Sequence, residues 1–124
     1  MKHVASTEAP AAVGPYSHAI LSNCLVFASG QIPLSPEIGT LAVGDIKEQA
    51  EQAIRNLKAV LTAAGSSLDH VVKTTCFLTD IDDFDDFNEV YAKHFTGRPA
   101  RSCVAVSDLP KGAMIEIEAI AEII

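Results

Sequence analysis

Pro99 to Ala121 reads P-A-R-S-C-V-A-V-S-D-L-P-K-G-A-M-I-E-I-E-A-I-A, and the rest of the chain is organised around this stretch. Both of its ends alternate in character, which predicts two half-buried β-strands. The L-P-K-G at 109–112 predicts a turn, so we expect the two strands to form a β-hairpin with a longer loop. Arg101 and Cys103 share one face, because residues two apart in a strand point the same way. Burying a charged group such as a guanidinium or the Glu116 carboxylate among apolar neighbours costs free energy, unless the group has a charged partner or binds a ligand. This stretch is therefore the candidate site.

The rest of the chain predicts a small α+β domain. The expected elements are an edge strand over 2–6, strands over 18–21 and 24–28 joined by a tight turn, a departure from the sheet at 29–33, a helix over 45–64, a strand over 71–78, and a helix from 82 or 83 to about 95. Asp45 is the expected cap of the first helix, with Glu48 at the capping-box position and Gly65 after its last turn. The order β-β-β-α-β-α-β-β predicts one domain over 1–124, with two helices on one face of a largely antiparallel sheet.

The opposite face of this sheet must meet either water or another subunit. The strands over 24–28 and 71–78, like the two final strands, carry apolar residues on both faces. We therefore predict a homo-oligomer that forms sheet face to sheet face.

Composition excludes several function classes. The formal net charge is −7 over 124 residues, which disfavours nucleic acid as a partner because phosphate binding relies on Lys and Arg. No apolar run approaches the roughly 18 residues of a membrane span, and the N-terminus shows no apolar signal segment. The three cysteines lie far apart without C-x-x-C spacing, which favours a reducing cytoplasm over a disulfide scaffold.

No motif indicates a metal or a cofactor. The four histidines are scattered without ligand spacing, and dinucleotide, P-loop and zinc-protease patterns are missing. The acidic run at 80–86 lacks the glycine and closing glutamate of a calcium loop, so we interpret it as a solvated helix start. Aromatic residues recur at helical spacing in the second helix and predict core packing: Phe84, Phe87, Tyr91 and Phe95.

The final stretch offers three candidate chemical groups, each with a structural alternative. Arg101 could clamp a carboxylate through a bidentate fork, or form a structural salt bridge to Glu116 or Glu118. Glu116 could activate a water molecule, or be an ordinary solvated carboxylate. Cys103 could be a nucleophile, or an inert half-buried thiol.

Two loop segments complete the candidate site. Tyr16, in a Gly-Pro-Tyr loop, could line a pocket or serve packing alone. Ser29-Gly30 leaves a backbone position open to the close approach of a ligand. Composition and spacing alone thus indicate a small α+β domain with a candidate anion site.

Six sequence pieces occur together and in order: G-P-Y-S (14–17), S-G-Q-I-P (29–33), N-E-V-Y (88–91), P-A-R-S-C-V (99–104), L-P-K (109–111) and I-E-I-E-A-I-A (115–121). In this combination the chain resembles the YjgF/Rid family, and closely its RidA branch of reactive-intermediate imine/enamine deaminases. The resemblance covers essentially the whole chain. It implies a chorismate-mutase-like (bacillus type) mixed sheet and a homotrimer whose three sites lie in clefts between subunits. The implied reaction hydrolyses 2-aminoacrylate and related 2-imino acids to 2-keto acids and ammonia, without metal or cofactor.

The resemblance also implies a role for individual residues. Arg101 would hold the substrate carboxylate and Glu116 would orient the attacking water. The remaining implied substrate contacts are the backbone at Gly30 and Cys103, Ser29 beside Gly30, and the side chains of Tyr16 and Asn88. The chain departs from many relatives at Thr96-Gly97-Arg98, which is short and carries Arg98 where an apolar residue is common. Since this segment borders the implied cleft, it bears on side-chain preference.

Two other function classes compete with the deaminase. A trimer could bind or sense a 2-keto acid without turnover, although carboxylate binding alone would not need Glu116. Ribonuclease activity or inhibition of translation is the third hypothesis, against which the net charge of −7 and the scattered histidines weigh.

Overall fold

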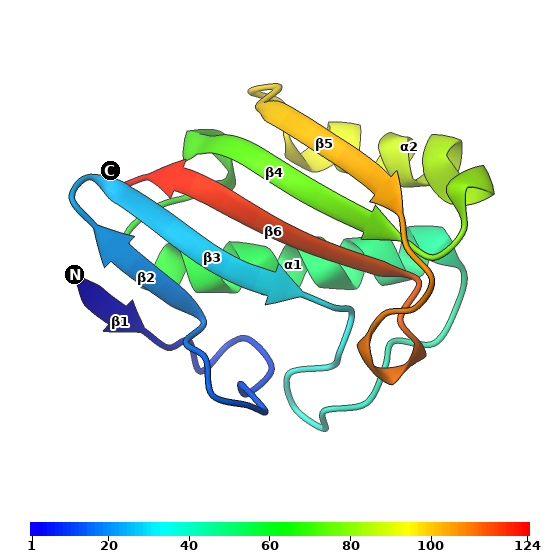
Figure 1. Cartoon of the computed structure of the whole chain (residues 1–124), viewed down its shortest axis with the longest axis horizontal. Helices are drawn as coiled ribbons and strands as arrows, with labels where there is room; N and C mark the ends of the chain where they lie inside the picture. The colour runs from blue at the N-terminus through cyan, green and yellow to red at the C-terminus, as the bar shows by residue number, and fades with distance from the viewer.

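The computed structural model describes all 124 residues as a six-stranded mixed sheet with two helices packed on it (Figure 1). The elements are β1 (Lys2–Val4), β2 (Ala19–Ser22), β3 (Leu25–Gln31), α1 (Ile46–Ala63), β4 (Val71–Leu78), α2 (Phe84–His94), β5 (Ala100–Ala105) and β6 (Ile115–Glu122). The predicted α+β class and the order β-β-β-α-β-α-β-β are confirmed. Short 3-10 turns stand before β4, α2 and β6.

The predicted hairpin between the last two strands is wrong. The sheet order is β1-β2-β3-β6-β4-β5, so β4 separates β5 from β6. β5 pairs parallel to β4, and β6 lies antiparallel to both β3 and β4 (Figure 1). Alternation reports which residues share a face but not which strand lies alongside. Here α2 is the crossover that returns the chain parallel to β4, as in a β-α-β unit.

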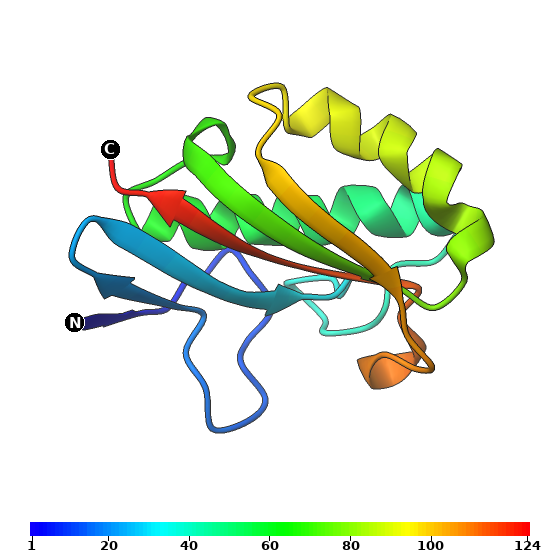
Figure 2. The same cartoon turned by 45° about the horizontal axis from the view of Figure 1, so that its top comes forward.

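Both helices cover the same face of the sheet, as Figure 2 shows. The Asp45 side chain caps α1 by accepting the backbone N–H of Glu48 at 3.1 Å, as predicted. The chain leaves α1 through Gly65 at φ +83°, a left-handed conformation that glycine adopts without strain. Fully buried side chains of α1, such as Leu57 and Leu61, belong to one apolar cluster with Ile115 and Ile117 of β6, so both elements contribute to the centre of the core.

The aromatic stripe of α2 is core, as predicted. Phe87, Tyr91 and Phe95 are buried, and Phe84 packs partly buried against them. The Tyr91 hydroxyl shares a hydrogen bond of 2.7 Å with Thr74 of β4, so its buried polar atom is satisfied. Tyr91 and Phe95 also line the cavity beside Arg101 that is part of the candidate site.

β3 runs further than predicted. It continues to Gln31, whereas the sequence indicated a departure from the sheet at 29–33. The pairing of β3 with β6 shifts register between Ala28 and Gln31, so Ser29 and Gly30 form an irregularity within the strand. Such bulges bend the strand and change the direction of its backbone and side chains, and this one brings Gly30 beside β6.

The second face of the sheet carries no helix and holds both apolar and charged side chains. Phe27 is 43% exposed and Val104 is 45% exposed on this open face. Ile120 lies half-buried next to Phe27, in agreement with the predicted two-faced sheet. No helix is long and apolar enough to cross a bilayer.

Candidate functional site: two half-sites on opposite faces of the sheet

Arg101 lies on the helix-covered face at the edge of the sheet. Its register partner on β4 is the fully buried Thr74, so the two side chains point toward α2. The Arg101 Nη1 donates a hydrogen bond of 2.7 Å to Asn88 Oδ1 on α2. The guanidinium carbon lies 4.7 Å from the ring centroid of Tyr91 and 5.5 Å from that of Phe84. One hydrogen bond and cation–π contacts with the rings of Tyr91 and Phe84 therefore hold the guanidinium in place.

No carboxylate of the chain pairs with Arg101. The two ion pairs of the structure are Lys47–Glu89 at 2.6 Å and His94–Glu51 at 2.9 Å. The alternative of a structural salt bridge from Arg101 to Glu116 or Glu118 is thus wrong within one chain. The half-buried guanidinium borders a cavity of about 600 Å³, the Arg101 cavity, whose lining is Asn88, Tyr91, Ala92, Phe95, Thr96, Arg98, Pro99 and Arg101.

Glu116 lies on the opposite, open face of the sheet. Glu116 pairs with Phe77 of β4. Side chains alternate along a strand and Cys76 points toward the helices, so Phe77 and Glu116 point to the open face. Glu116 borders a separate pocket of about 250 Å³, the Glu116 pocket, whose lining is Pro10, Ala11, Val13, Tyr16, Gly30, Gln31, Ile32, Leu34, Pro110, Lys111 and Glu116. Burial raises the pKa of Glu116 above the ordinary glutamate value, and the nearby Glu118 raises it further.

Gly30 is in close contact with the Glu116 side chain. A Cβ atom at Gly30 would collide with the Glu116 carboxylate, so only glycine fits at this bulge. Ser29 is used structurally, because its Oγ donates to the Ser17 carbonyl at 2.6 Å and its N–H donates to the His18 carbonyl at 2.9 Å. Tyr16 is 49% exposed and lines the same pocket. The Ser29-Gly30 bulge and the Tyr16 loop therefore belong to the Glu116 side of the sheet.

Cys103 has the properties of an inert thiol. It is half-buried on the helix-covered face, and its register partner is the fully buried Cys76. Burial raises the pKa of the Cys103 thiol, and the opposing effect of Arg101 is smaller. A raised pKa leaves little thiolate at neutral pH, which favours the inert alternative over a nucleophile.

The predicted site residues thus fall into two groups. Arg101, Asn88 and Cys103 lie on the helix-covered face, and Tyr16, Ser29, Gly30 and Glu116 belong to the opposite side of the sheet. Sequence reasoning missed Lys111 in the Glu116 pocket. The sequence indicated Lys111 only as part of the turn at 109–112, where its backbone is left-handed at φ +59°.

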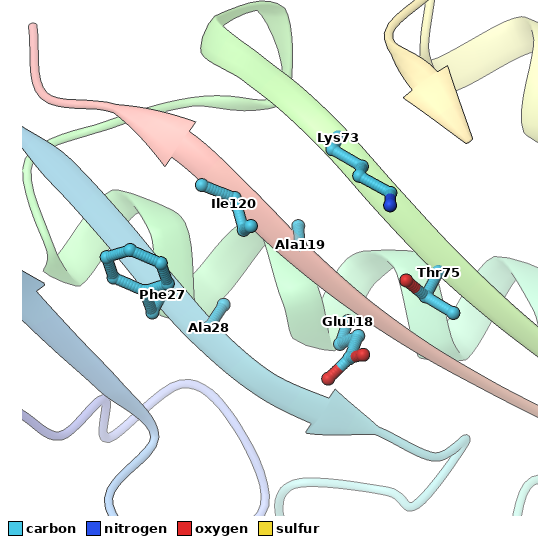
Figure 3. Close-up of a pocket in the computed structure, with 7 residues that line it drawn as sticks. All are labelled: Phe27, Ala28, Lys73, Thr75, Glu118, Ala119 and Ile120. Atoms are coloured by element: carbon cyan, nitrogen blue, oxygen red, sulfur yellow. The ribbon is translucent and has the colours of Figure 1, made fainter. Parts of the chain in front are cut away.

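The open face also has a shallow hollow of about 200 Å³ between β3, β6 and β4 (Figure 3). Phe27 and Ile120 form its apolar end, and Lys73 and Glu118 stand on neighbouring strands without forming an ion pair. Apolar and charged side chains therefore stand next to one another on the open face of the sheet. No group of three or more His, Cys, Asp or Glu side chains is placed to hold a metal ion.

Comparison with known proteins places the chain in a family. The model described as Endoribonuclease L-PSP matches residues 6–123. The chain is 57% identical over 114 residues to Protein HMF1 of Saccharomyces cerevisiae, covering 91% of this chain and 88% of that protein. It is 48% identical over 121 residues to the 2-iminobutanoate/2-iminopropanoate deaminase of Rattus norvegicus, covering 97% of this chain and 88% of that protein. Among solved structures, E. coli TdcF with bound serine superposes with a TM-score of 0.92 at 42% identity, covering 98% of both chains.

These matches run over nearly the whole chain and agree with the sheet topology and the sequence pieces that suggested the resemblance. The relatives carry varied names, so the comparisons establish the family more firmly than one activity. The chain belongs to the Endoribonuclease L-PSP family, which is the YjgF/Rid family.

Proposed function

We propose that this protein hydrolyses reactive 2-imino acids and their enamine tautomers, 2-aminoacrylate/2-iminopropanoate and 2-iminobutanoate, to 2-keto acids and ammonia. The observation that carries the proposal is a positioned guanidinium without a carboxylate partner, at Arg101. The rat relative is named for this activity, and the E. coli relative binds serine, which has an α-carboxylate. The direct test is whether the protein accelerates the loss of free imine that a serine or threonine dehydratase releases.

Arg101 would hold the substrate by its carboxylate. Asn88 Oδ1 already accepts a hydrogen bond from one guanidinium nitrogen, and the Tyr91 ring holds the guanidinium plane in position. A planar guanidinium can then donate two parallel hydrogen bonds to a carboxylate, which lysine cannot reproduce. β5 is an edge strand, so outward backbone N–H groups near Cys103 are available as further donors.

The active site would form between subunits. Arg101 and Glu116 lie on opposite faces of one sheet, so a single chain does not bring both to one substrate. In a cyclic homotrimer, the Arg101 face of one subunit can meet the Glu116 pocket of the next. The uncovered face around Phe27 and Ile120 would be buried in the same assembly. We therefore propose a homotrimer with three composite clefts.

Glu116 would orient and deprotonate the attacking water. The water oxygen forms a bond to C2 of the imine, the C=N bond becomes a C–N single bond, and the nitrogen gains a proton. Loss of ammonia from this tetrahedral intermediate leaves the 2-keto acid, so the net reaction consumes one water and releases one ammonia. An imine is already electrophilic, so holding it next to an oriented water supplies much of the required acceleration. A carboxylate whose pKa is raised by burial is a stronger base than an exposed one.

Replacing Glu116 with Gln is expected to lower kcat by about 10²–10⁴ with little change in 2-keto acid affinity, because the base is lost and the carboxylate clamp remains. In the wild type, activity should fall as the pH drops through the raised pKa of Glu116, above the ordinary glutamate value of about 4.3. The measurement is kcat/KM against pH. Glu118→Gln should move this acid limb to lower pH, because Glu118 raises the pKa of Glu116.

The same pKa shift has a consequence for stability. A carboxylate whose pKa is raised by folding binds protons more tightly in the folded state, so its contribution to stability declines as pH rises through the folded pKa. Glu116→Gln should therefore raise the melting temperature near neutral pH while removing activity. Unchanged turnover in this variant would refute the assignment of Glu116.

Cys103→Ala is expected to keep most of the activity, since the proposal uses only the backbone at this position. The check is turnover of the folded variant beside the wild type. A loss of more than about a hundredfold, equivalent to ~2.7 kcal/mol of barrier, would give the thiol a role in the reaction.

Two other functions remain as alternatives. Binding or sensing of a 2-keto acid would use Arg101 in the same way but would not need a pKa-shifted Glu116. A ribonuclease or translation inhibitor is opposed by the net charge of −7, because proteins bind phosphate backbones through excess Lys and Arg.

A reducing, cytoplasmic location stays a prediction favoured by three free cysteines.

A further inference from the structure

The Arg101 cavity contains a second guanidinium that the proposed mechanism does not use. Arg98 lines the same cavity as Arg101, three residues earlier in the chain. Its side chain is exposed and takes part in neither of the two ion pairs of the structure. Two arginines therefore border one cavity without a carboxylate partner for either.

The backbone fixes where Arg98 stands. Arg98 adopts φ +52°, a left-handed conformation that is uncommon for residues other than glycine. Its N–H donates a hydrogen bond of 3.1 Å to the carbonyl of Phe95, which closes the turn after α2. The following Pro99 has a restricted φ and leads directly into β5. The turn after α2 thus fixes the backbone from which the Arg98 side chain lines the cavity.

The lining of the cavity favours a ligand with more than one negative charge. Its polar side chains are Asn88, Thr96, Arg98 and Arg101, and none of the eight lining residues is acidic. This is unusual in a chain whose formal net charge is −7. Two guanidiniums on one cavity repel each other, and a dianion relieves that repulsion better than a single carboxylate.

The size of the cavity points the same way. This open hollow of about 600 Å³ leaves room beside Arg101 for a substrate side chain longer than that of a three-carbon imino acid. With the α-carboxylate on Arg101, the substrate side chain would extend through this volume toward Arg98.

We infer that the protein prefers 2-imino acids that carry a second carboxylate on the side chain, the α-carboxylate binding Arg101 and the distal carboxylate binding Arg98. This inference rests on the proposed function for the role of Arg101. It assigns Arg98 as the residue that determines specificity. The chemical class is a 2-imino dicarboxylic acid, whose hydrolysis product is a 2-keto dicarboxylic acid.

Binding of stable products tests this inference without requiring turnover. The probes are 2-oxoglutarate and 2-oxopentanoate, which have the same five-carbon chain and differ in the distal carboxylate. Isothermal titration calorimetry of the wild type should give at least about tenfold tighter binding of 2-oxoglutarate, as expected for a charge-assisted hydrogen bond. Arg98→Gln should abolish this preference and leave the affinity for 2-oxopentanoate unchanged.

Matched variants separate the inference from the proposed function. Arg55→Gln removes an exposed arginine on α1 that does not line this cavity, so it should keep the preference. Arg101→Ala should weaken both keto acids, because both have an α-carboxylate. Equal affinities in the wild type, a preference that survives Arg98→Gln, or equally strong binding of inorganic phosphate would overturn the inference. A protein that fails to hydrolyse imines yet shows the Arg98-dependent preference would disprove the proposed function alone.

Discussion

Replacing Arg101 with Ala is expected to lower kcat/KM for 2-imino acids by about 10²–10³ while the protein stays folded. The lost interaction is a bidentate pair with the substrate carboxylate. Hydrogen bonds to charged groups contribute about 1.5–3 kcal/mol each, so two of them account for a loss of this size. The side chain is half-buried and makes one hydrogen bond, to Asn88, so its removal takes little from the core. Steady-state kinetics together with thermal unfolding measures both effects.

Two control variants sharpen this prediction. Arg101→Lys keeps the positive charge but loses the planar fork, so it should recover only part of the activity. Arg55→Ala removes a solvent-exposed arginine of α1 outside the site and should behave as wild type. Wild-type activity in Arg101→Ala would show that the guanidinium does not bind the substrate.

Mixing two inactive variants should restore activity if the site is composite. Arg101→Ala and Glu116→Gln damage opposite faces of the sheet, and the proposed trimer joins the Arg101 face of one subunit to the Glu116 pocket of the next. After random subunit exchange at equal amounts, one quarter of the clefts would have both native residues, giving about a quarter of wild-type activity. The measurement is turnover after mild dissociation and reassembly of the mixture.

The double variant provides the necessary control. A chain carrying both substitutions is mixed with an equal amount of wild type. Without subunit exchange half of the clefts stay native, whereas random exchange leaves one quarter native, so a fall in activity from one half to one quarter shows that subunits exchange. Proven exchange without recovery in the mixture of single variants would mean that Arg101 and Glu116 act from one chain. That result would require a rearrangement of β5 or β6 that the present fold does not show.

Periodicity predicted the elements of the fold well because it reports burial. The alternation of β6 correctly separated Ile115 and Ile117, which are buried, from Glu116 and Glu118 on the open face. The capping of α1 by Asp45 was also predictable, because the required side-chain acceptor stands directly before the helix. Both are local properties of consecutive residues.

Strand partners were not predictable in the same way. β5 follows α2 and lies parallel to β4, so Arg101 ended on the face that α2 covers instead of opposite β6. No local pattern distinguishes that arrangement from a hairpin with a longer loop. Only the family resemblance implied clefts between subunits, an expectation that the placement of Arg101 and Glu116 on opposite faces makes specific and that the mixing experiment tests. The bulge at Ser29-Gly30 escaped notice because glycine is typical of both loops and irregular strands.

A coupled assay with a dehydratase measures directly whether the protein hydrolyses free 2-imino acids. The purified protein is added to a serine or threonine dehydratase in the presence of semicarbazide, and semicarbazone formation from the free imine is followed. We expect wild-type protein to suppress semicarbazone formation while 2-keto acid and ammonia accumulate, and Arg101→Ala to lose this effect. Undiminished semicarbazone with the wild type, combined with 2-keto acid binding by calorimetry, would contradict the deaminase and favour a binding protein.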